Sequence, residues 1–355
     1  MMKIILTGGG TAGHVMPNIA LLPQLRGLGF DISYIGSVDG MEKDLVAKEN
    51  LPYYGISSGK LRRYLSAKNI TDAFRVVRGV GQARKIIKKI APDIVFSKGG
   101  FVTVPVVLAA RLSKVPVIIH ESDITVGLAN KLCIPHATKV CCVFPETLAQ
   151  IPKSKALLTG TPIRQEIFDG SRIKGVALCN FPEEKPVIMI MGGSQGSAAI
   201  NNCIRDALDG LLTTFNIVHI CGIGNLNEAA KRPGYLQFEY VGEEMGHLYA
   251  AADLVVSRAG ANSLSELLAL SKPNVLIPLS RRASRGDQIL NAESFARQGF
   301  SVVIDEDDMD KDVLVKTITD TFENRGKYIA AMKKSGAENG ISSIVALIKE
   351  VAKTK

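Results

Sequence analysis

Short runs of β-branched and aliphatic residues alternate with longer amphipathic stretches along the chain. The short runs predict strands and the longer stretches predict helices, and this alternation is typical of βαβ units built around a parallel sheet. The expected strands are residues 3–7, 31–35, 94–96, 117–120, 140–143, 187–191, 217–220, 238–241, 253–256, 275–278 and 301–304. The expected helices are residues 17–28, 70–90, 198–212, 262–270, 286–298 and 340–353.

The two halves of the chain begin alike. Residues 3–7 lead into the glycine-rich run 8–13 and a helix, and residues 187–191 lead into the glycine-rich run 192–196 and another helix. Two such openings predict two doubly wound α/β domains in tandem. The join is expected near residues 159–162, where a glycine and a proline favour a turn.

Composition narrows the class of protein. Of the 355 residues, 46% are apolar and 22% are charged, which is typical of a globular chain. No apolar run reaches the roughly 18 residues of a membrane-spanning helix, and the start of the chain reads as a strand rather than a signal peptide. The six cysteines form no CxxC pair and are expected to be buried free thiols in a reducing compartment.

Positive charge is concentrated in the first half. Residues 1–160 contain 21 Lys and Arg against 10 Asp and Glu, whereas the rest contains 22 against 24, which leaves the chain at +9. Within residues 60–89, ten basic residues accompany one acidic residue, Asp72. We therefore expect an anionic partner for this region, either a lipid surface or a nucleic acid.

The expected helix 70–90 carries much of this charge, and its apolar side is expected to hold Ile70, Phe74, Val77, Ile86, Ile87 and Ile90. An ordinary solvated helix packed on a domain explains the pattern, and so does binding to an anionic membrane. Nucleic acid is less favoured because no aromatic platform accompanies the charge. The candidate membrane-binding residues are Arg62, Arg63, Phe74, Arg75, Arg78, Lys85, Lys88 and Lys89.

The first glycine-rich run suits a phosphate group at a helix N-terminus and satisfies the GxGxxG spacing of dinucleotide-binding dehydrogenases. Those enzymes need an acid at the end of the second strand, and here that strand runs into Ser37, with Asp39 two residues too late. A tight turn without a ligand is a further alternative. His14 begins the following helix, whose N-terminus favours a neutral imidazole, so His14 is a candidate general base.

Three loops of the second half have ligand-binding character. Residues 192–197 combine backbone N–H groups with a hydroxyl, which suits a diphosphate. Glu266, in the run 258–266, is a candidate for binding a ribose diol, although Ser263 and Glu266 also fit a capping box. Residues 285–288 begin another helix. All three loops follow carboxyl ends of expected parallel strands, where open α/β sheets bind ligands.

Residues 120–123, His-Glu-Ser-Asp, follow the same edge of the first expected sheet. His120 and Glu121 are metal-ligand types, but no third ligand is spaced for a metal, so polar residues that shape the site are the favoured interpretation. No role is assigned to His136, His219 or His247.

Seven motifs occur in order, namely residues 9–14 (GGTAGH), 97–102 (SKGGFV), 120–123 (HESD), 160–164 (GTPIR), 192–196 (GGSQG), 257–266 (SRAGANSLSE) and 287–292 (DQILNA). Together they resemble the MurG family of GT-B glycosyltransferases over nearly the whole chain. The resemblance implies two Rossmann-like α/β domains, each with a doubly wound parallel sheet, that face a cleft. The first domain, 1–163 with a C-terminal helix at about 338–355, would bind the acceptor and the membrane; the second, 164–337, would bind UDP-N-acetylglucosamine (UDP-GlcNAc).

The activity that the resemblance implies is inverting transfer of GlcNAc from UDP-GlcNAc to the C4 hydroxyl of undecaprenyl-diphospho-MurNAc-pentapeptide, which converts lipid I to lipid II in peptidoglycan synthesis. The implied location is peripheral, at the cytoplasmic face of the cell membrane. UDP-GlcNAc is a substrate, and no cofactor or metal is expected. The implied partners are UDP-GlcNAc, lipid I, an anionic membrane surface and other cell-wall synthesis proteins, but no nucleic acid.

The resemblance also assigns residues. His14 would be the catalytic base. The implied UDP-GlcNAc-binding residues are Thr11, Ala12, Gly13, Asp123, Arg164, Ser194, Gly242, Ala261, Asn262, Glu266 and Gln288.

Two departures bear on these assignments. Many members have glycine where this chain has Ala12, and Gln-Asn where it has Ser122-Asp123. An ionised Asp123 only accepts hydrogen bonds, which weakens its expected contact with the sugar. A branch of the family in Gram-positive bacteria is similar to this variant.

Three other functions stay open at this point. Another GT-B transferase with a lipid acceptor, such as a diacylglycerol glucosyltransferase, would share the fold and differ in acceptor. An NAD-dependent dehydrogenase would bind NADH. A non-enzymatic membrane adaptor would bind liposomes through residues 60–90 and would have no nucleotide site.

Overall fold

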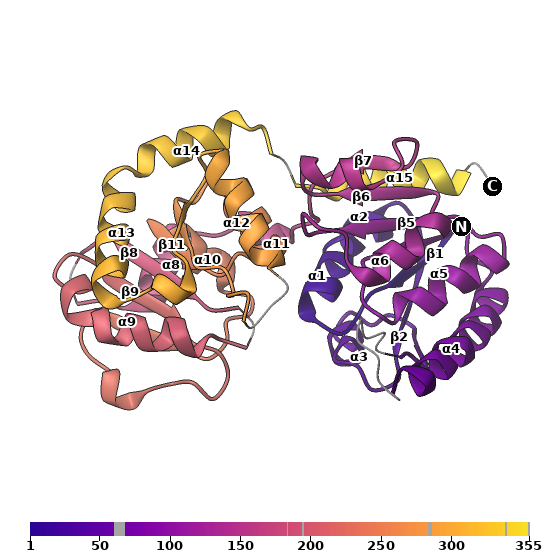
Figure 1. The fold of residues 1–355 in the computed structure, drawn as a ribbon, viewed down its shortest axis with the longest axis horizontal. Coiled ribbons are helices and arrows are strands. Elements are labelled where there is room, and N and C mark those ends of the chain that lie inside the picture. The colour runs from indigo at the N-terminus through magenta and orange to yellow at the C-terminus, as the bar shows by residue number, and fades with distance from the viewer. Residues whose placement is uncertain (60–67, 183, 194, 283–285, 338, 354–355) are drawn as a thin grey trace. The chain divides into compact units, whose positions relative to one another are not determined.

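The computed structural model describes residues 1–59, 68–182, 184–193, 195–282, 286–337 and 339–353, without the side chains of residues 68–71 and 73. The chain forms two compact units (Figure 1). Unit 1 comprises Met1–Arg164 and Asn339–Lys355, and unit 2 comprises Gln165–Glu338. These boundaries lie one residue after the expected 163/164 and 337/338 junctions. Unit 2 is therefore inserted within the sequence of unit 1.

In the described part of unit 1, seven parallel strands form one sheet in the order β3-β2-β1-β4-β5-β6-β7. The order reverses between β1 and β4, which is the point where doubly wound sheets bind ligands beyond the carboxyl ends of their strands. The strands are β1 (Lys3–Thr7), β2 (Asp31–Ser37), β3 (Tyr53–Ile56), β4 (Ile94–Ser97), β5 (Val117–Glu121), β6 (Lys139–Cys142) and β7 (Ala156–Leu158).

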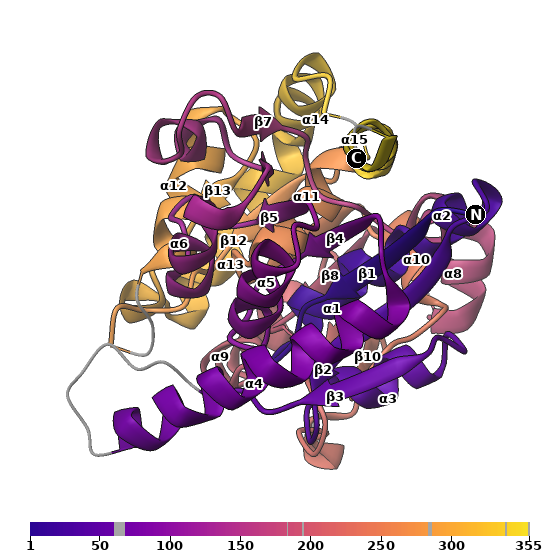
Figure 2. The same cartoon turned by 90° about the vertical axis from the view of Figure 1, so that its right-hand side faces the viewer.

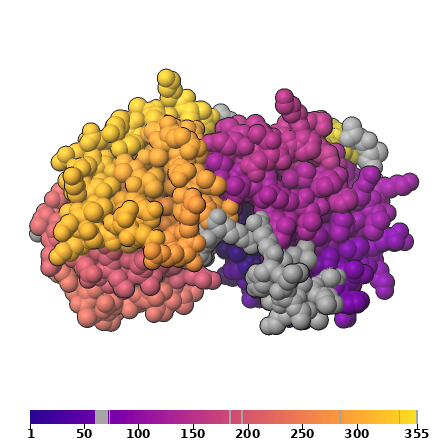
Figure 3. Space-filling model, viewed as in Figure 1, coloured from indigo at the N-terminus to yellow at the C-terminus, as the bar shows by residue number. Residues whose placement is uncertain are grey.

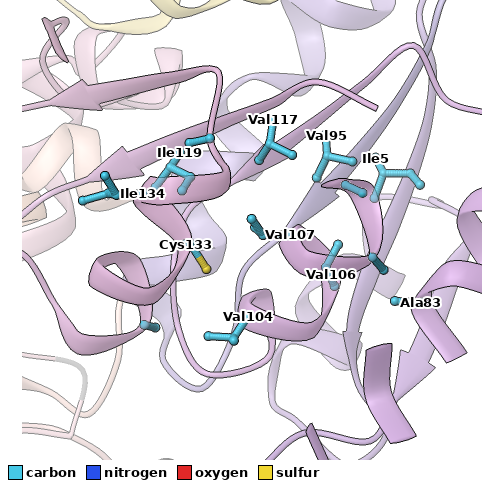
Figure 4. Packing of buried hydrophobic residues seen from close by; sticks show 14 of the residues in the cluster. Ile5, Ala83, Val95, Val104, Val106, Val107, Val117, Ile119, Cys133 and Ile134 are labelled. Atoms are coloured by element: carbon cyan, nitrogen blue, oxygen red, sulfur yellow. The ribbon is translucent and has the colours of Figure 1, made fainter. Parts of the chain in front are cut away.

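Helices cover both faces of this sheet, because successive residues of each strand point to opposite sides. Ile5, Val95 and Val117 pack with α4, α5 and α6 on one face (Figure 4). Ile4 and Leu6 pack with α1, α2, α3 and α15 on the other. The helices are α1 (Ala12–Ala20), α2 (Leu22–Gly27), α3 (Glu42–Ala47), α4 (Lys68–Ile90), α5 (Thr103–Leu112), α6 (Leu128–Cys133) and α15 (Ile341–Lys353), with the 3₁₀ helices η1 (Ile134–His136) and η2 (Pro145–Gln150).

Helix α15 returns the end of the chain to unit 1, as its yellow colour among indigo and magenta elements shows (Figure 1). Its apolar residues recur at helical spacing, and Ile344 and Ile348 are fully buried against the sheet. The two passages of the chain between the units are tied together within unit 1. The Asn339 side chain accepts from Ile163 N at 3.0 Å and donates to Ile163 O at 2.7 Å.

In the described part of unit 2, six parallel strands form a sheet in the order β10-β9-β8-β11-β12-β13. Ile188, Ile190 and Val256 pack with α9 and α13 on one face. In the space-filling view, yellow residues of α13 and α14 cover the upper part of this unit and pink residues of α9 the part below (Figure 3).

The strands of unit 2 are β8 (Val187–Met191), β9 (Asn216–Ile220), β10 (Tyr235–Phe238), β11 (Leu254–Ser257), β12 (Asn274–Leu276) and β13 (Val302–Val303). Its helices are α7 (Gln165–Phe168), α8 (Arg172–Cys179), α9 (Ala198–Leu211), α10 (Met245–Ala251), α11 (Ala261–Ala269), α12 (Asp287–Arg297), α13 (Lys311–Glu323) and α14 (Arg325–Lys334), with the 3₁₀ helices η3 (Glu228–Ala230) and η4 (Glu306–Asp308).

Two expected elements were wrong in detail. The expected strand 238–241 is Tyr235–Phe238, because Phe238 pairs with Ile220, the last residue of β9, and the chain beyond it has no neighbouring strand. The expected helix 17–28 is two helices, α1 and α2. A proline in the first turn of α2 has no N–H to continue the hydrogen bonds of α1, so the helix restarts there.

All six cysteines are buried, as expected for structural thiols. Among the described residues, no helix has the length and apolar character needed to cross a membrane.

Candidate active site

Three loops meet at the carboxyl edge of unit 1, after β1, β4 and β5. The first two pack backbone against backbone: Gly9 N donates to Gly99 O at 3.3 Å. A Cβ on Gly100 would lie 2.3 Å from Gly9 O, and Gly99 and Gly100 have φ of +102° and +90°. Only glycine accommodates both the close approach and this conformation. The first glycine-rich run and the Ser-Lys-Gly-Gly run therefore form one structure.

Glu42, on α3, forms hydrogen bonds that connect the first glycine-rich run to the end of β2. Its fully buried carboxylate accepts from Gly10 N at 3.2 Å and from Ser37 N at 2.9 Å, and also bonds the Ser37 hydroxyl. A dinucleotide pyrophosphate at this loop would meet a carboxylate where it needs N–H donors. The arrangement disfavours the dehydrogenase interpretation.

His14 lies in the first turn of α1, half-buried. Its Nδ1 is 3.0 Å from Gly9 O and 3.2 Å from Thr11 Oγ1. Because a carbonyl only accepts, Nδ1 carries the proton in the neutral ring and Nε2 keeps its lone pair. Burial, followed by the positive charge of Lys98, lowers the pKa of His14. The sequence interpretation named the helix N-terminus as the cause, whereas burial is the largest one.

Lys98 follows β4 and is almost fully buried, with 2% of its surface exposed. Its Nζ lies 2.9 Å from His120 Nδ1 and donates to Ser122 Oγ. His120 Nε2 is 2.9 Å from Gly160 O, so Nε2 carries the proton and Nδ1 accepts from Lys98. Burial, with Lys98 as the second cause, keeps the pKa of His120 well below its usual value.

Glu121 organises the loop after β5. Its two carboxylate oxygens accept from Ser122 N, Asp123 N, Gly127 N and Asn130 Nδ2 at 2.9–3.1 Å. Burial raises the pKa of this carboxyl. In the described residues, no group of three or more His, Cys, Asp or Glu side chains is placed to hold a metal. The structure favours the interpretation that His120 and Glu121 shape the site.

The glycine-rich run of unit 2 packs against the loop after β9. A Cβ on Gly196 would lie 1.9 Å from Cys221 O, and one on Gly222 would lie 2.5 Å from Gln195 O. Gly193, with φ of +92°, would place a Cβ in open space. Ser197 caps α9 by accepting from Ile200 N at 3.3 Å. The loop thus has one side fixed by packing and one side open.

Arg258 joins three loops of unit 2, a role that sequence reasoning missed although the residue lies within a predicted motif. Its guanidinium donates to Ile277 O at 3.1 Å, Pro278 O at 3.2 Å and Ser197 Oγ at 2.6 Å. It also pairs with Glu306, whose carboxylate accepts from Ser280 N at 3.0 Å. A buried arginine with these partners fixes the loops relative to one another.

Helix α11 begins at Ala261 after Gly260, and in the described residues no side chain caps it. Ser263 therefore lies inside the helix, and the capping-box interpretation of Ser263 and Glu266 is wrong. Glu266 is half-buried and accepts from Tyr249 Oη at 3.0 Å. The Tyr249 hydroxyl thus fixes the position of this carboxylate on the helix that follows the carboxyl end of β11.

The other predicted residues of unit 2 lie at the same edge. Gln288, in the first turn of α12, accepts from Leu279 N at 3.1 Å. Gly242 lies in the turn between β10 and α10. A cavity of about 320 Å³ is lined by Gly192, Gly196, Ser197, Ala198, Ala199, Arg258, Leu279, Gln288 and Glu306.

The structure thus gathers the predicted residues in two groups. In unit 1, Thr11 precedes α1, and Ala12, Gly13 and His14 form the first turn of that helix. Asp123 lies in the loop after β5. In unit 2, Ala261, Asn262 and Glu266 lie on α11, Gln288 lies in the first turn of α12, and Gly242 lies in the turn between β10 and α10. Arg164 is the last residue of unit 1 before the chain enters unit 2. Ser194 lies outside the described residues.

Helix α4 presents a mixed basic and apolar surface. It lies beside α5 (Figure 2), and its packed stripe is Val76, Val80, Ala83 and Ile87 at helical spacing. Phe74 and Val77, which were expected on the apolar side of this helix, fall outside that stripe and are 73% and 70% exposed. Exposed basic residues accompany them, namely Arg75, Arg78, Arg84, Lys85, Lys88 and Lys89. Arg62 and Arg63 lie outside the described residues.

Comparison with known proteins agrees with this architecture. Residues 4–142 match the glycosyltransferase family 28 N-terminal domain, and residues 187–348 match the family's C-terminal domain. A crystal structure of MurG from Acinetobacter baumannii is 27% identical, with a TM-score of 0.79, and the match covers 99% of this chain and 100% of that chain. The fold is therefore GT-B.

Curated relatives are closer in sequence. A UDP-N-acetylglucosamine--N-acetylmuramyl-(pentapeptide) pyrophosphoryl-undecaprenol N-acetylglucosamine transferase from Clostridium botulinum is 57% identical over 354 residues, covering 99% of this chain and all of the relative. A transferase of the same name from Clostridium tetani is 57% identical over 349 residues, covering 98% of each. With both domain types matched in order and such identity across nearly its full length, the chain belongs to glycosyltransferase family 28.

Proposed function

We propose that the protein transfers N-acetylglucosamine from UDP-GlcNAc to the C4 hydroxyl of the muramoyl sugar in pyrophosphoryl-undecaprenol-linked N-acetylmuramyl-pentapeptide, the step from lipid I to lipid II. The observation that carries the proposal is the 57% identity, over 99% of the chain, to a curated transferase of that name. The geometry of the two carboxyl edges fits such a reaction, with a diphosphate-type loop in unit 2 and a candidate base in unit 1.

Unit 2 holds the donor in this scheme. Glu266, positioned by Tyr249, accepts hydrogen bonds from the ribose diol, and the backbone of Gly242 contacts the uracil. Ser194 and Arg164 bind the diphosphate region. The N-termini of α9 and α11 direct N–H groups and partial positive charge to the same edge. Ala261, Asn262 and Gln288 bind the sugar.

Unit 1 holds the acceptor and supplies the base. His14 Nε2 takes the proton of the C4 hydroxyl while that oxygen forms a bond to C1 of the donor sugar. The bond from C1 to the UDP oxygen breaks on the opposite face, and UDP leaves with the electron pair, so the anomeric configuration inverts. Thr11, Ala12, Gly13 and Asp123 contact the donor from this unit.

The developing negative charge on UDP is met by Arg164 and by loop N–H groups, which is electrostatic stabilisation of the leaving group. The scheme requires no metal. Turnover measured with and without excess EDTA should therefore be the same, and loss of turnover that Mg²⁺ restores would overturn this part of the proposal.

The acceptor is a lipid, so the reaction takes place at a membrane surface. We assign membrane contact to the exposed part of α4, where Phe74 and Val77 are surrounded by arginines and lysines. Peripheral binding at the cytoplasmic face places the protein where a nucleotide sugar and a lipid-linked acceptor are both accessible.

The test offers purified protein radiolabelled UDP-GlcNAc with either lipid I or diacylglycerol. Label should enter lipid II and should not enter glycolipid. A thermal-shift series with UDP, UDP-GlcNAc, UDP-glucose and NADH accompanies it, because a ligand that binds the folded state raises its unfolding temperature. Protection by UDP-GlcNAc and none by NADH is expected. Label in diacylglycerol, or no UDP-GlcNAc protection at millimolar concentration, would overturn the proposal.

A further inference from the structure

Lys98 is a buried cation at the carboxyl edge of unit 1 to which the reaction scheme assigns no role. Its ammonium group contacts His120, near the end of β5, and Ser122, in the loop that follows β5. Its backbone extends the sheet, since Lys98 N donates to Thr7 O at 2.9 Å. The Lys98 side chain thus connects the loop after β4 to the end of β5 and the loop that follows it.

His120 cannot replace this cation. Its Nε2 proton is engaged by Gly160 O and its Nδ1 lone pair accepts from Lys98, so the imidazole is neutral. The positive charge therefore resides on Lys98, and the carboxylates of Glu121 and Asp123 stabilise it. Burial lowers the pKa of Lys98 to about 8, which leaves the ammonium form predominant at neutral pH.

The same residue lies next to the candidate base. A Cβ on Gly8 would lie 2.5 Å from His14 O and 3.3 Å from Lys98 Cβ. The backbone of His14 and the side chain of Lys98 therefore both lie against Gly8. A Cβ on Gly99, the residue after Lys98, would lie 3.7 Å from His14 Cδ2. The His14 ring therefore packs beside the backbone that carries Lys98.

Three charged groups of the described residues act on His14. Asp123, from the loop after β5, and Glu42, from α3, favour the imidazolium, whereas Lys98 opposes it. Without the Lys98 charge, the electrostatic effect of the two carboxylates on His14 would not be opposed by a cation among those three groups, and His14 would hold a proton more tightly.

We propose that Lys98 is a positioning residue of the transfer reaction: it holds residues 120–123 through His120 and Ser122, and its charge acts on His14, whose ring packs beside the backbone that carries Lys98. The inference rests on the proposed function, because it takes His14 as the base. It gives the lysine of the Ser-Lys-Gly-Gly run a role, whereas the proposed contacts with the donor and the acceptor give it none.

The decisive variant is Lys98→Met, which keeps the volume and removes the charge. The His14 pKa, followed by NMR of histidine-labelled protein, should rise by about 0.5–1 unit. The acid limb of the kcat/KM profile should move upward by the same amount, which is about a 3- to 10-fold loss of rate at a pH below both pKa values. An unchanged or lowered His14 pKa in the folded variant would overturn the proposal.

A second variant, Lys98→Gln, retains a donor for His120 while removing the charge. It should raise the His14 pKa as Lys98→Met does, and it keeps the test available if the apolar variant fails to fold. The matched control is Lys272→Met, in the connection between α11 and β12 of unit 2, whose Nζ donates to Ala252 O at 2.8 Å. Lys272 is not among the charged groups that act on His14. The control should leave the His14 titration and kcat/KM unchanged.

The readouts separate this inference from the proposed function. Absence of transfer to lipid I by the wild-type protein would overturn the function, yet the NMR titration would still report whether Lys98 controls His14. Transfer by the wild type with equal His14 pKa values in all variants would overturn the Lys98 role alone. UDP affinity should be the same in both Lys98 variants, because the uracil and ribose contacts are assigned to Gly242 and Glu266 of unit 2.

Discussion

At the scale of single residues, His14 illustrates how a loop determines a tautomer. The Gly9 carbonyl lies 3.0 Å from Nδ1 and requires a proton there, so the lone pair is on Nε2, away from the loop. A base needs this arrangement, because a ring whose outward nitrogen is protonated cannot accept a proton. The conformation of the glycine-rich run therefore determines which ring nitrogen of His14 can accept a proton.

Replacing His14 by alanine should lower kcat about 10²–10⁴-fold, the usual contribution of a general base, while UDP binding stays as in the wild type. Steady-state kinetics and UDP titration calorimetry measure the two effects. His136→Ala is the control, since η1 lies away from the carboxyl edge of the sheet. Near-normal turnover of the His14 variant would remove it from the base role.

His219 should make stability depend on pH. It is fully buried between Tyr235 Oη at 2.8 Å and Asn201 Oδ1 at 3.0 Å, and burial lowers its pKa to about 3. The unfolded state takes up this proton near pH 6.5 and the folded state does not, so stability falls as pH decreases from about 6.5 towards 3.

As the pH falls from 7.5 to 5, protonation of this residue in the unfolded state should lower the free energy of unfolding of unit 2 by about 2 kcal/mol. Urea unfolding at both pH values, comparing wild type with His219→Gln, tests the point: the variant should lose less stability on acidification. His136→Gln should behave as the wild type does. Equal pH dependence in wild type and His219→Gln would contradict the assignment.

The sequence indicated His14 as a candidate base because glycines and the start of a helix surround it. It did not identify the contacts of Glu42, Lys98 or Arg258, whose partners lie 32, 22 and 61 residues away along the chain. In the sequence alone, such charged side chains cannot be distinguished from exposed polar residues, because their partners become neighbours only in the folded structure. A paired buried charge is a property of tertiary structure, and local patterns do not encode it.

At the scale of elements, the central strands were predicted well because they are buried on both faces and consist of continuous apolar runs. Strands β3 and β7 were missed. They are the edges of the sheet, β3 contains Gly55, and β7 has three residues. An edge strand pairs on one side only, so its sequence is under weaker constraint and its signal is short.

Helix α4 is the element whose surface should bind membranes. The double variant Arg75→Glu/Arg78→Glu should weaken sedimentation with anionic liposomes several-fold, and rising salt should weaken wild-type binding in the same way. Phe74→Ser should weaken binding with little effect on its salt dependence. Lys333→Glu/Lys334→Glu, on exposed positions of α14, is the charge-matched control. Equal loss in the control would show a non-specific charge effect.

At the scale of the whole molecule, unit 1 depends on the last helix of the chain. Ile344 is fully buried in the core that also contains Ile4 and Leu6. Ile344→Ala should destabilise unit 1 by about 2–5 kcal/mol, because it removes buried apolar surface and leaves a cavity.

Denaturant unfolding with a probe in each unit measures this effect. Ile173→Ala, at a position that is 84% exposed on α8, should change stability by no more than about 0.5 kcal/mol. If Ile344→Ala shifts only the transition of unit 2, the packing of α15 on unit 1 is contradicted.

The return of α15 to unit 1 has a consequence for biosynthesis. A ribosome completes every residue of unit 2 before it reaches residues 341–353, so the domain encoded in the middle is the first with a full set of core residues. Until then the nascent sheet of unit 1 lacks the helix that covers Ile4 and Leu6. Domains of multidomain proteins usually mature from the N-terminus onward. Here the order is reversed, and the first unit to be translated is the last to be finished.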